Sequence, residues 1–134
     1  MDQRHLFTGA GYNCAEAVLA ALTGSRDHVS CASGFGGGIG GSGQTCGAVT
    51  GALMGMGLVL GARDPETPAS YECFRSQVSR FLDSFEAEFG STLCRELLDR
   101  PNAGNPESRC AEFVDYAAHT GREIIRRAGG RPGT

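Results

Sequence analysis

The sequence predicts an all-α fold, a compact single-domain bundle of about five to six helices around a buried, glycine-rich central helix. Apolar residues recur at helical spacing over residues 71–89 and 107–128, and no segment shows the alternation of a half-buried strand. A chain of 134 residues can bury one hydrophobic core without cross-links. We therefore expect one helical domain over residues 1–128 and a flexible tail over residues 129–134.

The first helix is predicted over residues 14–22. Asn13 is a favourable N-cap, and Glu16 stands three residues after it, so that the two residues form a capping box. Gly24 is placed to end the helix because glycine readily adopts the left-handed conformation of a C-terminal cap. A further helical turn is expected over residues 27–32.

The central helix is predicted over residues 46–62, with Thr45 as its cap. This segment carries no charge, but it is short for a membrane span, which needs about 20 apolar residues. Gly47, Gly51 and Gly55 recur every four residues, so one face of the helix lets another backbone approach closely. The segment therefore fits the buried centre of a bundle better than a transmembrane helix.

The second half of the chain predicts three more helices. Residues 71–89 form an amphipathic helix, with Ser70 as N-cap and Gly90 as its end. A short helix follows around Cys94. The last helix is predicted over residues 107–128, with an apolar face toward the core.

Four cysteines stand at or near predicted helix starts: Cys14, Cys46, Cys94 and Cys110. A helix N-terminus carries partial positive charge and unpaired N–H groups, and both make a thiol easier to ionise. The thiolate is the form that attacks disulfides and binds metals. We expect Cys46 to be the most reactive, because it combines a cap, a helix start and a glycine-rich approach.

The spacing of the cysteines leaves their chemistry open. No CxxC pair occurs, which excludes the thioredoxin, zinc-ribbon and c-type haem signatures. Any common site must therefore be assembled by the fold. The alternative is that the cysteines act as small buried hydrophobic residues. Cys31 and Cys73 stand outside the helix-start pattern, and we interpret them as accessory or structural.

A glycine-rich stretch covers residues 34–43. Gly36, Gly38 and Gly41 reproduce the letters of the dinucleotide-binding fingerprint. That fingerprint requires a preceding strand and an acidic residue about 20 positions later. No strand is predicted here, and Gly61 stands where the acid should be, so a nicotinamide cofactor is not expected.

A better interpretation of these glycines is that they surround a sulfur site. Without side chains, Gly36, Gly37, Gly38 and Gly47 let the backbone pass close to Cys46. Their N–H groups are then candidates to bind a thiolate, a cluster sulfide or another anion. The alternative is that the stretch is only a tight, flexible connection.

Charge and composition exclude several functions. The net charge of −3 and the absence of a basic run give no reason to expect nucleic acid. All positive charges are arginines, so a Walker-type lysine and a Schiff-base lysine are excluded. The N-terminus has no apolar signal core, so we expect a cytoplasmic protein, where cysteines more often serve redox or metal chemistry. His5, His28 and His119 are scattered and are not expected to be ligands.

At Cys14, the run CGAVTG over residues 46–51, Cys94 and Cys110, the sequence resembles the redox-active family named for its C_GCAxxG_C_C pattern. The run SGFGGGI over residues 33–39 also fits, and the resemblance covers nearly the whole domain. It implies a redox role for these four cysteines and gene neighbourhoods with transporters. It also implies similarity to the iron–sulfur portion of split-Soret cytochromes, although no haem site is present here.

The leading hypothesis is a small redox protein that uses these four cysteines. They would ligate an iron–sulfur centre, with [2Fe–2S] the best match to four thiolates, or cycle between thiol and disulfide with an unknown partner. A second hypothesis is an accessory module that holds zinc or another soft metal without redox turnover and is associated with transport. A third is a structural helical domain, with a homodimer through the glycine face as one form of it.

Overall fold

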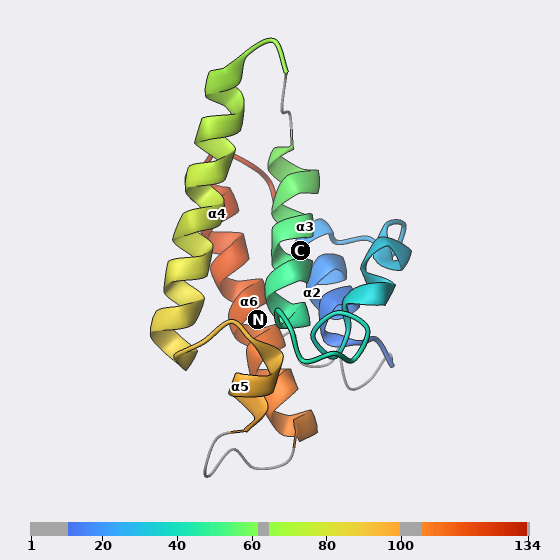
Figure 1. Cartoon of the computed structure of the whole chain (residues 1–134). Helices are drawn as coiled ribbons and strands as arrows, with labels where there is room; N and C mark the ends of the chain where they lie inside the picture. The colour runs from blue at the N-terminus through green and yellow to red at the C-terminus, as the bar shows by residue number, and fades with distance from the viewer. Residues whose placement is uncertain (1–10, 62–64, 100–105, 134) are drawn as a thin grey trace.

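The computed structural model describes residues 11–61, 65–99 and 106–133. Across these ranges the chain forms five α-helices and one 3-10 helix, which confirms the all-α prediction (Figure 1). In chain order they are α2 (Cys14–Thr23), the 3-10 helix η1 (Val29–Phe35), α3 (Gly47–Leu60), α4 (Pro68–Phe89), α5 (Cys94–Leu98) and α6 (Pro106–Arg127).

Helix α2 begins and ends almost where the sequence predicts. The Asn13 side chain accepts a hydrogen bond from the Glu16 N–H, and Glu16 Oε1 accepts one from the Asn13 N–H, each 2.9 Å long. Gly24 ends the helix in the left-handed conformation, with φ of 69°. The turn expected over residues 27–32 is shifted, because the 3-10 helix η1 runs from Val29 to Phe35.

Helix α3 packs its glycine face against α2. A Cβ atom added to Gly51 would lie 2.9 Å from the Ala15 Cα, and one added to Gly55 would lie 2.8 Å from the Leu22 Cβ. The predicted close approach of a second backbone is therefore confirmed. Because α2 of the same chain covers this face, a homodimer cannot use it while α2 stays in place. None of the helices in the described ranges has the length and apolar character that a bilayer span requires.

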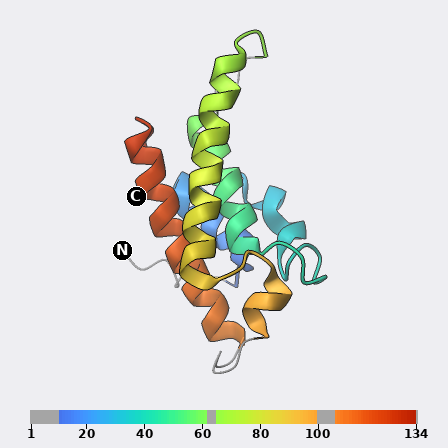
Figure 2. The same ribbon diagram turned by 60° about the vertical axis from the view of Figure 1, so that its left-hand side comes forward.

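Helices α4 and α6 lie side by side and close the core from the other side of α3 (Figure 2). Aromatic rings join them: the Phe89 ring centroid lies 4.9 Å from that of Phe113 and 5.2 Å from that of Tyr116. Gly90 ends α4 as predicted. The prediction that Ser70 caps α4 is wrong, because the helix already begins at Pro68, a residue that suits a first turn.

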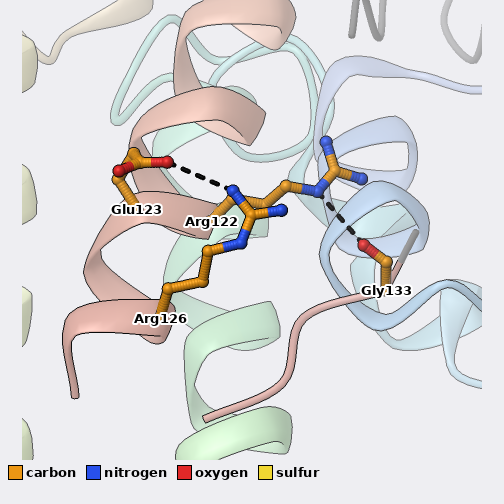
Figure 3. A network of polar contacts seen from close by, with 4 residues as sticks. All are labelled: Arg122, Glu123, Arg126 and Gly133. Carbon is orange, nitrogen blue, oxygen red and sulfur yellow. Dashed lines mark hydrogen bonds and ion pairs between the residues drawn. The ribbon is translucent and has the colours of Figure 1, made fainter. Parts of the chain in front are cut away.

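The C-terminal tail lies against the end of α2 (Figure 3). The Gly133 N–H donates to the Leu22 carbonyl at 2.6 Å. The buried Arg122 side chain donates from Nε to the Gly133 carbonyl at 3.1 Å and from NH2 to the Ala21 carbonyl at 2.9 Å. The bonds to Ala21 and Leu22 satisfy carbonyl groups that the end of a helix leaves unpaired. The sequence predicts flexibility here, whereas the structure holds Gly133 by its backbone.

Candidate four-cysteine site

The four predicted site cysteines lie on four different helices. Cys14 and Cys94 are the first residues of α2 and α5, and Cys46 is the N-cap residue of α3. Cys110 lies four residues after the first residue of α6, so it is farther from a helix start than predicted. The influence of a helix dipole falls off within the first turn. The helix-start argument therefore applies to three of the four thiols.

A short backbone pairing brings the starts of α3 and α5 together. Thr45 and Leu93 form an isolated antiparallel bridge. On either side of it, the Cys46 N–H and the Cys94 N–H each donate to a carbonyl of the opposite segment at 2.7 Å. The pairing therefore fixes two of the cysteines relative to each other. The sequence gives no sign of it, because a single bridge needs no alternating run of residues.

Gly47 makes room for the sulfur of Cys14. A Cβ atom added to Gly47 would overlap the Cys14 Sγ, and it would lie 3.0 Å from the Phe35 carbonyl oxygen and 3.1 Å from the Ala15 nitrogen. Any larger residue at this position would have to displace the thiol or the start of α2. Gly47 therefore contributes to the site by being small, since it leaves room for the Cys14 sulfur.

The glycine-rich stretch contacts the site through Gly38. A Cβ atom added to Gly38 would lie 2.6 Å from the Cys94 Cβ, and the residue has a positive φ of 71°. Gly36 instead packs against the side chain of Asn13, the cap of α2. These glycines thus position Cys94 and the start of α2, whereas the sequence predicts an approach to Cys46.

Hydrogen bonds within the stretch hold its shape. The carbonyls of Gly36, Gly37 and Gly38 accept bonds of 2.9–3.1 Å from the N–H groups of Gly41, Gly43 and Gln44. The amides that act on the Cys46 sulfur are those of Ala48 and Val49, in the first turn of α3. The expected role of the glycines as N–H donors to this sulfur therefore remains a prediction.

Burial controls the ionisation of Cys46. The residue is only 3% exposed, and burial strongly raises the pKa of its thiol, with further increases from repulsion by the Cys14 and Cys94 thiolates. The amides of Ala48 and Val49 lower this pKa, as expected at a helix start, but their effect is smaller. The expectation that Cys46 ionises easily therefore does not hold.

Burial and repulsion between thiols also raise the pKa values of Cys94 and Cys110. Burial raises the pKa of Cys94, and repulsion by Cys14 raises it further. Burial raises the pKa of Cys110 to about 11, with contributions from Cys14 and then Cys94. Cys14 thus acts on all three of its neighbours, and the four thiols form one electrostatic group. All of them are free, with Cys14 and Cys46 buried and Cys94 and Cys110 partly exposed.

Comparison with protein families gives a match over residues 12–124 to the family described as "Putative redox-active protein (C_GCAxxG_C_C)". The chain belongs to the C_GCAxxG_C_C family. This description agrees with the redox role that the sequence predicts, and it names no cofactor. Comparison with curated proteins and with solved structures gives no match.

Membership of the C_GCAxxG_C_C family leaves the cofactor to be tested against the geometry. Four thiolates are the donor set of a [2Fe–2S] cluster and of many structural zinc sites. Within the described ranges, however, no three Cys, His, Asp or Glu residues are grouped as a metal site requires. The donor chemistry therefore fits a metal, whereas the positions of the donors do not.

The remaining candidates from the sequence lie apart from this group. Cys31 on η1 and Cys73 on α4 are exposed, and neither contributes to the raised pKa values of Cys46, Cys94 and Cys110. His28 and His119 are exposed as well. The prediction about His5 lies outside the described residues.

Proposed function

We propose that Cys14, Cys46, Cys94 and Cys110 form a thiol redox group that exchanges electrons with a disulfide of a partner molecule. The observation that supports this proposal is the influence of Cys14 on the ionisation of the three other thiols, which come from distant parts of the chain. Free thiols gathered in this way are suited to disulfide exchange.

In this proposal, Cys94 meets the partner because it is partly exposed, whereas Cys14 is buried. The Cys94 thiol loses its proton to water, and its thiolate attacks one sulfur of the partner's disulfide. The other partner sulfur leaves and takes up a proton. Cys14 then attacks the Cys94 sulfur, and the second partner sulfur leaves as a thiol. The partner gains two electrons and two protons, and the protein retains a Cys14–Cys94 disulfide.

Cys14 is the proposed resolving thiol because, after burial, its interaction with Cys94 is the second cause that raises the pKa of Cys94. Raised pKa values also set the direction of electron flow. A dithiol whose thiolate form is poorly stabilised is a reductant. The reduction potential of thioredoxin is about −270 mV, against about −120 mV for strongly oxidising dithiols. We expect the reduction potential of the four-thiol group to lie near or below that of thioredoxin, so that the group donates electrons in the reducing cytoplasm.

The test is a count of free thiols after anaerobic incubation with glutathione disulfide. The parent protein should lose two thiols from the group, and peptide mapping should show a Cys14–Cys94 disulfide. Cys94→Ser should prevent this disulfide, while the matched control Cys73→Ser, which removes an exposed thiol outside the group, should leave it intact. A disulfide that forms equally well in Cys94→Ser and in the parent would contradict the proposal.

A metal–thiolate centre is the second candidate, because four thiols match the donor set of an iron–sulfur cluster or zinc. A nearby cation would also relieve the repulsion among these thiols. Metal analysis after anaerobic purification distinguishes the cases. Iron with visible absorbance would support a cluster, stoichiometric zinc would support a metal module associated with transport, and neither, with no thiol loss, would support a structural domain.

A further inference from the structure

A second candidate site lies between α4 and α6, which run side by side (Figure 1; Figure 2). A cavity of about 310 Å³ opens between these helices. Tyr116 on α6 reaches across and donates a hydrogen bond to the Ser84 carbonyl on α4 at 3.1 Å. This bond holds the two helices together at the cavity, so the space is part of the folded structure.

The cavity gathers positive charge. Arg80 from α4 and Arg127 from α6 both line it, and neither has an ion-pair partner within the described part of the chain. By contrast, the arginines that have an ion-pair partner on their own helix, three residues away, are Arg75, Arg109 and Arg126. Arg80 and Arg127 thus bring two guanidinium groups from different helices to one cavity, and no ion pair among the described residues neutralises either of them.

The acid in the lining does not cancel this charge. Glu123 lies at the cavity, but its carboxylate is paired with Arg126 at 3.2 Å (Figure 3). His119 and the hydroxyl-bearing Thr120 add further polar groups, while the side chain of Ile124 supplies an apolar wall. The lining thus combines cationic donors with hydroxyl groups and an apolar surface.

We propose that this cavity binds a small organic anion, either a phosphate ester or a polycarboxylate, through Arg80 and Arg127. A guanidinium group donates two parallel hydrogen bonds to a phosphate or a carboxylate, and two such groups on different helices can hold one anion from both sides. The site does not involve the cysteines, so it is independent of the proposed redox function.

Calorimetric titration of the full chain with sodium pyrophosphate and with citrate, at low ionic strength, tests the proposal. The parent should bind at least one probe, and the stronger one identifies the ligand class. The double variant Arg80→Gln/Arg127→Gln should weaken binding by about tenfold or more, since each lost bond is charge-assisted. Arg75→Gln is the matched control, because Arg75 lies on the surface of α4 outside the cavity.

Three results would overturn the proposal. The parent could bind neither probe at millimolar concentration, the double variant could bind as well as the parent, or Arg75→Gln could lose as much affinity as the double variant. The last result would mean that the probes respond only to overall charge. Cys94→Ser should retain the binding, so failure here is distinguishable from failure of the redox proposal.

Discussion

Replacing Gly51 by alanine tests how closely α2 and α3 pack, and hence how the cysteine-bearing helix α2 is placed. The added Cβ atom would lie 2.9 Å from the Ala15 Cα and would overlap the Ala15 carbonyl oxygen. Backbone atoms cannot move aside as a side chain can, so the helices must separate. Such overpacking costs about 1–3 kcal/mol. Alanine offsets part of this, because it favours a helix over glycine by about 0.5–1 kcal/mol.

Gly57→Ala on the same helix is the matched control. The nearest atom to an added Cβ there is the Phe74 Cζ at 3.8 Å, an ordinary contact. The control should therefore gain about 0.5–1 kcal/mol from helix propensity alone. The two variants, which carry the same chemical change, should move the free energy of unfolding in opposite directions.

Urea and thermal unfolding of the reduced proteins measure both effects. For a chain of this length, about 1 kcal/mol corresponds to a shift in Tm of about 3–5 °C. Gly51→Ala should melt below the parent, and Gly57→Ala at or above it. If Gly51→Ala were as stable as Gly57→Ala, α2 and α3 would not pack backbone to backbone, and the placement of Cys14 would lose its structural basis.

Three further predictions concern Arg122 and the thiols. Arg122→Gln should lower the free energy of unfolding by about 1–3 kcal/mol, because the Ala21 carbonyl near the end of α2 and the Gly133 carbonyl of the tail lose their guanidinium donor. Arg126→Gln removes an exposed ion pair and should change this free energy by less than about 1 kcal/mol. The pKa of Cys110 is raised to about 11 from its ordinary value of 9.0. The contribution of this thiol to the free energy of unfolding is therefore complete below pH 9 and is lost as the pH rises toward 11. Urea midpoints should therefore fall over this window, and less so in Cys110→Ala; an equal fall would contradict the assignment. Iodoacetamide should alkylate Cys94 faster than Cys46 in the folded protein, as followed by peptide mass spectrometry, and equal rates would contradict the burial of Cys46.

The sequence predicts best those features that depend on neighbouring residues. The capping box of Asn13 and Glu16 and the left-handed Gly24 are local, and the structure has both. The close packing on α3 could also be predicted, because glycines at every fourth residue indicate a face that another backbone approaches closely. The predicted start of α4 is three residues too late, since Pro68 initiates the helix ahead of the expected cap.

The environment of the thiols could not be predicted in the same way. The bridge between Thr45 and Leu93 joins residues 48 positions apart and leaves no periodic pattern. The ionisation of Cys46 is misjudged because the helix start is visible in the sequence, whereas the burial that outweighs it arises only from tertiary packing. The central position of Cys14 among the thiols likewise follows from the fold.

The two segments joined by the bridge between Thr45 and Leu93 are far apart along the chain, and this has a consequence for experiments. In the denatured ensemble the thiols are far apart and titrate as ordinary cysteines, so their special environment arises only in molecules that have completed folding. The rate at which Cys46 is labelled, measured across a denaturant series, therefore reports the fraction of native molecules, and the thiol itself serves as a built-in probe of refolding.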